Sequence, residues 1–220
     1  MNSNPAKTTD VPDFDFYKDD YDGRSWIWYR GLVSDCVAHG LPGPILDVGC
    51  GSGLLVECAM RYGLDIRGID GSELAIKQAK ERFPLARVQL HDLRNGIPYS
   101  ENTFEVVICH QVIEHLLPFT CSSLFGEVFR VLRHRGTFLV YSPSCYNPDG
   151  VRDSCHINLF SPSRLHNELS RTGFQIKSIN GAPRIVPPGG WLGRKISSFL
   201  YFRLGFEQLA LAANAVAEKP

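Results

Sequence analysis

The stretch that decides the fold is Pro44-Ile45-Leu46-Asp47-Val48-Gly49-Cys50-Gly51-Ser52-Gly53. Its first half is a short apolar run, and its second half holds glycines at positions 49, 51 and 53. This order is typical of a buried parallel strand that ends in a tight turn. Because glycine has no Cβ atom, the backbone of such a turn can approach a ligand closely. The apolar-periodic residues from Leu54 onward predict a helix whose first N–H groups face an acidic ligand group. We therefore expect a strand, a glycine turn and a helix that bind a nucleotide.

The spacing of the three glycines separates two classes of nucleotide-binding loop. A dinucleotide-binding loop reads G-x-G-x-x-G, whereas this one reads G-x-G-x-G and continues with Leu54. Asp47 lies at the strand end, where it repels a pyrophosphate and attracts an ammonium group. The eight residues from Ile45 to Ser52 resemble the first motif of class I S-adenosylmethionine (SAM) dependent methyltransferases. That resemblance implies SAM as cofactor, S-adenosyl-L-homocysteine (SAH) as product, and a loop that holds the methionine part.

The alternation of strand and helix patterns predicts an α/β fold with right-handed crossovers. The resemblance implies a three-layer Rossmann-like sandwich with a mostly parallel seven-stranded sheet and an antiparallel last strand. Expected strands are 45–48, 65–69, 86–90, 104–109, 136–142, 174–180 and 213–220. The alanines of the last segment favour a helix, and the methyltransferase topology favours a strand, which we predict. We expect residues 1–24 to be a flexible segment or lid and 25–220 to form the methyltransferase domain.

Acidic residues at strand ends are the candidates for cofactor binding. Asp70 lies 21 residues after Gly49, the offset of a carboxylate that accepts both ribose hydroxyls, although it also suits a turn before a helix. The resemblance implies that Asp92 reaches the adenine amino group and that Leu93 flanks the ring. Arg30 follows Trp28 and Tyr29, where related enzymes supply an arginine to the SAM carboxylate. The cofactor residues that we predict are Arg30, Asp47, Gly49, Cys50, Gly51, Asp70, Gly71, Asp92, Leu93, His110 and Gln111.

Three polar residues past the fourth expected strand are the catalytic candidates. Methyl transfer to a hydroxyl group needs positioning, together with a general base or a metal that handles the proton. Glu114 and His115 follow the strand, and His156 lies in the loop after the fifth strand, so all three should reach one edge of the sheet. Two histidines and a carboxylate suit a base or a metal ligand set. The structural alternatives are that Glu114 caps the next helix and that His156 fixes its loop through a carbonyl group.

A narrower resemblance concerns the same residues. Val-Ile-Glu-His-Leu at 112–116, with the later His156, resembles the Glu-x-x-Glu-His…His metal set of small-RNA 2′-O-methyltransferases. It also resembles ubiquinone-pathway O-methyltransferases. Gln111 stands where that set has its first glutamate, so one anionic ligand is missing and the metal stays unassigned.

Composition limits the partners. The 220 residues are 44% hydrophobic and 21% charged with zero net charge, which suits one soluble domain and argues against nucleic acid. Seven cysteines without a C-x-x-C pair favour a reducing, cytoplasmic location. No apolar run is long enough to span a membrane. The amphipathic segment Trp191–Leu204 suits a core-facing helix, a substrate wall or a peripheral membrane contact.

These observations predict a SAM-dependent methyltransferase that modifies a small-molecule acceptor, at a hydroxyl oxygen. Within the same class, N- or C-methylation and small-RNA 2′-O-methylation are the alternatives. An NAD-dependent oxidoreductase and a non-catalytic SAM-binding module are the alternatives from other classes.

Overall fold

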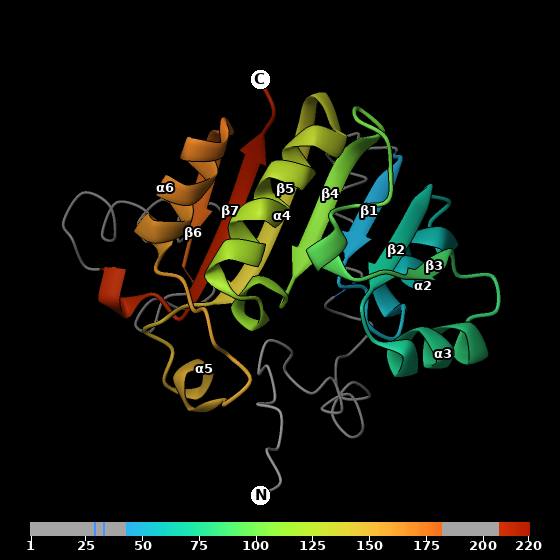
Figure 1. The fold of residues 1–220 in the computed structure, drawn as a ribbon, viewed down its shortest axis with the longest axis horizontal. Helices are drawn as coiled ribbons and strands as arrows, with labels where there is room; N and C mark the ends of the chain where they lie inside the picture. Colours follow the sequence, from blue (N-terminus) through green and yellow to red (C-terminus); the bar gives the residue numbers. More distant parts are fainter. Residues whose placement is uncertain (1–28, 30–32, 34–42, 182–206) are drawn as a thin grey trace, which may run out of the picture.

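A seven-stranded mixed sheet forms the centre of the protein (Figure 1). The computed structural model describes residues 29, 33, 43–181 and 207–220. Strand order is β3-β2-β1-β4-β5-β7-β6. The strands are β1 Ile45–Val48, β2 Ile66–Asp70, β3 Val88–Leu90, β4 Phe104–His110, β5 Leu132–Pro143, β6 Gln175–Asn180 and β7 Ala212–Glu218.

The sheet is parallel from β3 to β5, and β7 runs antiparallel between β5 and β6. In Figure 1 the arrowheads of β1, β2 and β4 point to the lower edge, so their carboxyl ends share that edge, while β7 points upward. The expected topology, including the antiparallel last strand, is confirmed. The alanine-rich tail forms a strand rather than a helix because β5 pairs with it over seven residues and its alternate alanines are buried.

Helices cover both faces of the sheet, which gives three layers. Residues along β4 alternate between two apolar clusters: Phe104 and Val107 belong to one, and Val106 and Ile108 to the other. The helices are α2 Leu54–Arg61, α3 Glu73–Arg82, α4 Pro118–Val131, α5 Pro148–Arg152 and α6 Pro162–Thr172, with 3-10 turns η3 Leu93–Asn95, η4 Ile113–His115 and η5 Glu207–Leu209. The first cluster includes side chains of α4 and α6, and the second includes those of α2 and α3. Both faces of the central strands are therefore buried, so the strands read as continuous apolar runs.

Some predicted features lie outside the described residues. They are the N-terminal segment 1–24, Arg30, and the amphipathic segment Trp191–Leu204. Within the described ranges, no helix combines the length and the apolar character that crossing a bilayer requires.

Candidate active site

The glycine turn after β1 has the backbone geometry that its residues permit. Gly49, Gly51 and Gly53 have φ angles of 74°, 51° and 76°, in the left-handed region that L side chains rarely adopt. A Cβ atom on Gly49 would collide with the side chain of Val112, the residue before η4. The turn therefore lies directly against the segment that carries Glu114 and His115.

Two buried carboxylates lie beside this turn, at the ends of β1 and β2. Asp70 accepts hydrogen bonds from the N–H of Gly51 and the N–H of Ser72, both at 2.8 Å. Burial raises the pKa of Asp70, and these two donors oppose the rise by stabilising its charged form. Burial, with the nearby Asp70 charge as a second cause, raises the pKa of Asp47 to about 8. Asp47 is therefore largely protonated at pH 7, and the two N–H donors favour the charged form of Asp70.

Cys50 contributes its backbone to the turn, because its N–H donates to the Ile69 carbonyl group at 3.0 Å, and its thiol donates a weak hydrogen bond to the Gly51 carbonyl group at 3.9 Å. A Cβ atom on Gly68 of β2 would lie 2.7 Å from both Cβ and Sγ of Cys50, so the side chain packs against the sheet. Gly71, by contrast, is exposed between Asp70 and Ser72.

The segment after β3 holds the residues predicted for the adenine ring. The Asp92 carboxylate accepts hydrogen bonds from Nε and Nη2 of Arg94 and from the backbone N–H of Arg94, which caps η3. The Arg94 hydrogen bonds lower the pKa of Asp92, so this carboxylate is ionised and can only accept. Leu93 packs at the border of the apolar cluster under α4. The adenine role of both residues stays a prediction.

His110 and Gln111 occupy the carboxyl end of β4. The His110 ring lies edge-on between two tyrosines, with centroids 6.2 Å from Tyr29 and 6.0 Å from Tyr141. Gln111 has a φ of 57°, and its N–H donates to the Tyr141 carbonyl group at 2.8 Å. A positive φ strains the backbone of a non-glycine residue, and such residues are found mostly at functional sites. This agrees with the predicted position of Gln111 near the sulfonium. Tyr141, which no sequence pattern singled out, pairs with His110 in the β4–β5 register.

The structure brings Glu114, His115 and His156 together. One ligand atom from each residue lies within 4.8 Å of the other two, and the two imidazole centroids are 4.9 Å apart. Backbone hydrogen bonds fix the loop to η4: the N–H groups of Ile157 and Asn158 donate to the Glu114 carbonyl group. The predicted convergence of η4 and the loop after β5 is therefore observed.

Both histidines have a defined orientation. Nδ1–H of His115 donates to the Cys155 carbonyl group at 3.0 Å, and Nδ1–H of His156 donates to the Gly150 carbonyl group at 2.8 Å. In each neutral ring Nε2 then carries the lone pair, as a general base or a metal ligand requires. The carbonyl contact that we considered as the structural alternative for His156 thus exists, and it is compatible with a chemical role.

Comparisons with known proteins decide the family. A family model described as "Methyltransferase domain" matches residues 46–140. The "Probable S-adenosylmethionine-dependent methyltransferase" of Mycolicibacterium smegmatis is 29% identical over 165 residues, covering 71% of this chain and 62% of that protein. The "Ubiquinone biosynthesis O-methyltransferase" of Photorhabdus laumondii is 35% identical over 166 residues, covering 62% of this chain and 64% of that protein. The matched stretch thus spans less than two thirds of either relative.

Residues 46–140 belong to this methyltransferase-domain family, and the chain as a whole is similar to class I SAM-dependent methyltransferases. The crystal structure of "a SAM dependent methyltransferase from Archaeoglobus fulgidus" has the same fold, with a TM-score of 0.63 at 17% identity over 87% of this chain and 94% of that one. The family resemblance stated from the sequence is confirmed, and membership implies SAM as the methyl donor.

The donor set of Glu114, His115 and His156 also fits a divalent metal. One carboxylate and two imidazole Nε2 atoms are ligands that zinc and iron accept, whereas magnesium prefers oxygen. The backbone carbonyl groups on both Nδ1 atoms supply the outer contacts that orient metal-binding histidines. Glu114, which is 0% exposed, would be the anionic ligand.

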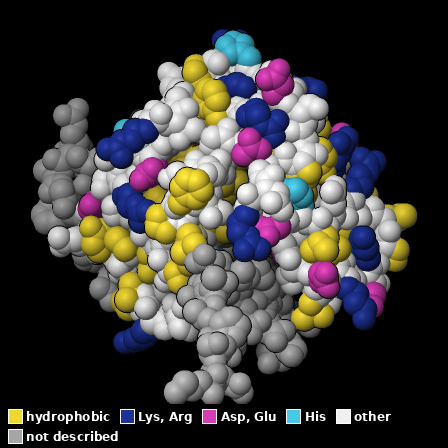
Figure 2. Space-filling view, in the orientation of Figure 1, with side chains coloured by type: hydrophobic (Ala, Val, Ile, Leu, Met, Phe, Trp, Pro, Cys, Tyr) yellow, Lys and Arg dark blue, Asp and Glu magenta, His cyan; other side chains and the backbone are white. Residues whose placement is uncertain are grey.

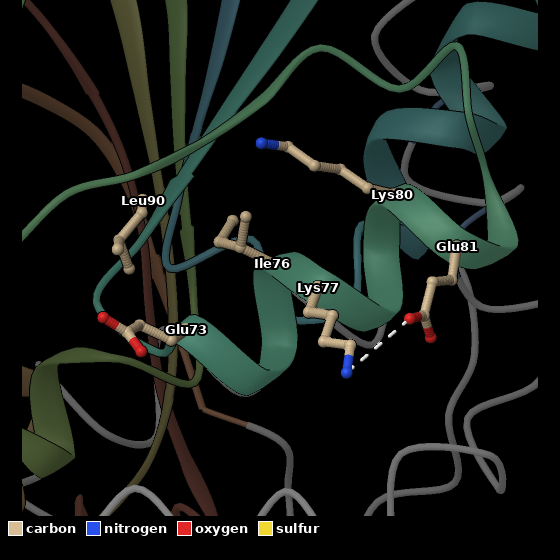
Figure 3. Close-up of a pocket in the computed structure, with 6 residues that line it drawn as sticks. All are labelled: Glu73, Ile76, Lys77, Lys80, Glu81 and Leu90. Carbon is tan, nitrogen blue, oxygen red and sulfur yellow. Dashed lines mark ion pairs between the residues drawn. The ribbon is translucent and has the colours of Figure 1, made fainter.

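A separate cavity lies on the outer side of α3 and β3. It has a volume of about 440 Å³ and is lined by charged residues of α3 together with Ile76 and Leu90 (Figure 3). Lys77 and Glu81 form an ion pair across its rim at 3.9 Å. None of the predicted site residues lines this cavity, so chemistry rather than volume identifies the active site.

Proposed function

We propose that this methyltransferase transfers the SAM methyl group to a hydroxyl oxygen of a small-molecule acceptor. The observation that supports this most is the Glu114, His115 and His156 group beside the turn that carries Gly49. A hydroxyl acceptor has to lose its proton as the O–C bond forms, and imidazole is the side chain suited to this near neutral pH. The similarity to ubiquinone-pathway O-methyltransferases agrees with oxygen as the methylated atom.

In the proposed complex, Asp70 accepts the ribose hydroxyls and Asp47 faces the methionine ammonium group. Asp92 and Leu93 take the adenine ring, and the end of β4 at His110 and Gln111 faces the sulfonium. The cofactor also contacts the backbone of Gly49, Cys50, Gly51 and Gly71. Arg30, which lies outside the described residues, binds the carboxylate of the methionine part of the cofactor. Residues 1–24 are proposed as a lid. This arrangement orients the methyl group toward the edge that His115 and His156 occupy, and in-line positioning supplies much of the rate.

In the proposed step, Nε2 of the His156 or His115 imidazole accepts the hydroxyl proton while the methyl group moves to oxygen. The bond from the methyl carbon to the sulfonium breaks, and SAH leaves with its electron pair. Glu114 is fully buried, with a carboxylate oxygen within 4.8 Å of a ring nitrogen of each histidine, and it stabilises the imidazolium that forms. Asp153, whose Oδ2 lies 3.6 Å from Nε2 of His156, adds a second negative charge nearby. The same three residues would hold a divalent metal, which would instead supply a lowered pKa of the acceptor hydroxyl.

Exposed apolar side chains beside this group support an acceptor with apolar surface. Phe119, Val151 and Ile157 are 83%, 58% and 46% exposed. Figure 2 shows hydrophobic side chains gathered on the lower left of this face, where Figure 1 draws the start of α4 and α5. Zero net charge gives no support for a nucleic-acid acceptor. The described cysteines are all free thiols, which agrees with the proposed cytoplasmic location.

The experiment screens a library of hydroxylated small molecules for a mass gain of one methylene with SAM, and then compares two histidine variants on the acceptor found. His156→Ala should lower kcat by about 10²- to 10⁴-fold and leave the SAH dissociation constant unchanged. His166→Ala, an exposed histidine of α6, is the matched control and should retain full activity. Full activity of His156→Ala would overturn the base assignment. Loss of activity on dialysis against a chelator, with recovery on adding zinc or manganese, would assign the metal role instead.

A further inference from the structure

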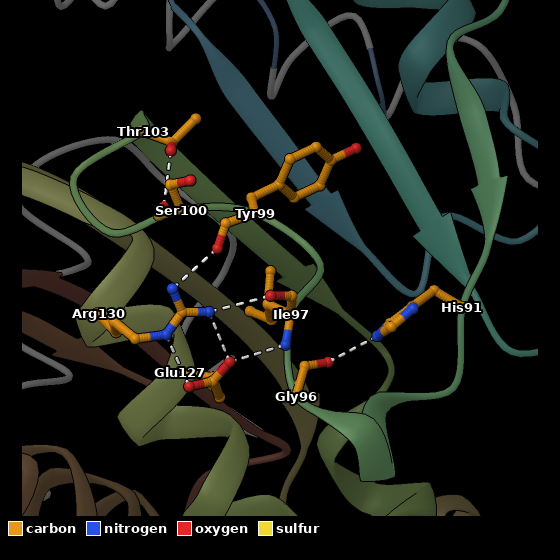
Figure 4. A network of polar contacts seen from close by, with 8 residues as sticks. All are labelled: His91, Gly96, Ile97, Tyr99, Ser100, Thr103, Glu127 and Arg130. Atoms are coloured by element: carbon orange, nitrogen blue, oxygen red, sulfur yellow. Dashed lines mark hydrogen bonds and ion pairs between the residues drawn. The ribbon is translucent and has the colours of Figure 1, made fainter.

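The connection from β3 to β4, residues 91–103, carries both residues proposed for the adenine ring. Asp92 and Leu93 begin it, and η3 is followed at once by Gly96 and Ile97. In Figure 4 this connection passes along α4, and the Arg130 side chain reaches from the helix to its backbone. The position of the adenine residues therefore depends on how firmly α4 holds this connection.

Arg130 uses three nitrogen atoms in these contacts. Nη1 donates to the Tyr99 carbonyl group at 2.8 Å and Nη2 donates to the Ile97 carbonyl group at 3.0 Å. Nε and Nη2 also donate to the Glu127 carboxylate, at 2.8 Å and 2.7 Å. The planar guanidinium group has this fixed fork of donors, which lysine lacks.

Glu127 holds the same connection through its carboxylate, and we call the pair of Arg130 and Glu127 the clamp. Its Oε2 accepts the Ile97 N–H at 2.8 Å, so one residue pair on α4 satisfies both backbone groups of Ile97. Gly96 permits the approach: its φ is 79°, and a Cβ atom there would lie 2.7 Å from Glu127 Oε2. His91 at the start of the connection contacts the Gly96 carbonyl group through Nε2 at 2.9 Å. The side chain of Ile97 is buried in the cluster beneath α4, where Leu93 also packs.

We propose that Arg130 and Glu127 are positioning residues for the cofactor, which act by clamping the connection that presents Asp92 and Leu93 to the adenine ring. The proposal rests on the adenine part of the proposed function and adds two residues on α4 that do not touch the ligand. Without the clamp, the connection keeps its sequence and its η3 cap but has to become ordered when the ligand binds. Affinity for the adenine end of the cofactor then falls, because ordering costs conformational entropy.

The test measures adenosine and SAH binding by calorimetry in four variants of the full chain. Arg130→Met should weaken both ligands by the same factor, about tenfold, because one charge-assisted set of hydrogen bonds is lost. Arg130→Lys should fall between this variant and the wild type, since a lysine can reach only part of the set. Leu93→Ala removes the proposed ring contact directly and provides the reference loss.

Arg133→Met is the matched control. It also removes an arginine–glutamate pair, from Arg133 Nη1 to Glu105 Oε1 at 2.9 Å, and this pair lies at the start of β4 and β5, the sheet edge opposite the proposed cofactor site. Its thermal midpoint should fall less than that of Arg130→Met, because one exposed contact is lost rather than four hydrogen bonds, and its ligand affinities should stay at the wild-type value. At a temperature where both variants are fully folded, a loss of affinity in Arg130→Met is what a purely structural role of Arg130 would not produce.

Two outcomes would overturn the proposal. If Leu93→Ala weakens adenosine binding and Arg130→Met does not, the adenine assignment stands and the clamp has no effect on it. If neither variant weakens adenosine binding while SAH still binds, the adenine ring lies elsewhere, and the clamp proposal fails without affecting methyl transfer as the proposed function.

Discussion

The buried Asp47 carboxyl group makes a sharp prediction about cofactor binding. Its pKa is raised to about 8 because burial disfavours the charge and the neighbouring Asp70 repels it. The proposed partner of Asp47 is the ammonium group of the cofactor, which favours the ionised form. Binding near neutral pH should therefore release the proton that Asp47 holds in the free protein, and affinity should rise with pH.

The magnitude follows from linkage. Below a pKa of about 8, each pH unit raises the fraction of ionised Asp47 about tenfold, which is about 1.4 kcal/mol of binding free energy. The SAH dissociation constant should therefore fall about tenfold between pH 6 and pH 7 and level off near pH 8. The stability of the free protein should change in the opposite sense. The folded state keeps the proton between pH 3.8 and about 8 and the unfolded state does not, so this group lowers stability as pH rises through that window.

The assay is isothermal calorimetry of SAH binding at several pH values from 6.0 to 7.5, in two buffers of different ionisation enthalpy. The wild type should release close to one proton for each SAH bound at pH 7. Asp47→Asn keeps the shape of the side chain and should show no proton release and a flat affinity profile. A wild-type dissociation constant that is constant over this range, with equal heats in the two buffers, would refute the reasoning.

Two further predictions concern packing at the site. Gly49→Ala should lower the free energy of unfolding by about 2–4 kcal/mol, because the new Cβ atom would collide with Val112 and the φ angle is positive. Urea denaturation measures this loss, and the double variant Gly49→Ala/Val112→Ala should recover part of it. An unchanged urea midpoint for Gly49→Ala would contradict the prediction. Phe119→Ser should raise the KM for the acceptor several-fold in steady-state kinetics without changing SAH affinity. Leu85→Ser, at 81% exposure against 83% for Phe119, is the control on another surface, and equal KM values for the two variants would remove the acceptor role of this apolar surface.

The sequence predicted the sheet well because its strands carry strong local signals. Phe104–His110 is buried on both faces, and its continuous apolar run therefore predicted a strand. The observed strand is one residue longer than the predicted one. The tail was decided by the topology of the resembling family, against the helix propensity of its alanines. Pairing with β5 makes the tail a strand, and no local sequence pattern indicates such long-range pairing.

Element boundaries were predicted less well. The fifth strand was predicted to begin at 136, but it begins at Leu132, so Arg133 lies in the strand and forms an ion pair with Glu105. The short helix α5 was not expected, although Asn147 before Pro148 is a capping signal. Five residues are too few for a helical period to show in the sequence.

The site itself was partly predictable. Residues at the carboxyl ends of parallel strands meet at one edge, so the grouping of Asp47 with Asp70 followed from topology alone. The contacts of Arg130 with Ile97 and Tyr99 were not predictable, because they join residues about 30 positions apart that share no sequence pattern. The same holds for the orientation of the two histidines, which backbone carbonyl groups determine.

A crystal structure of the protein with bound SAH tests the central claim most directly. The account predicts the ribose hydroxyls within about 3 Å of the Asp70 carboxylate, with the sulfur atom between the glycine turn and the group of Glu114, His115 and His156. SAH bound in the cavity on the outer side of α3, or a ribose that leaves Asp70 in contact only with Gly51 and Ser72, would contradict it.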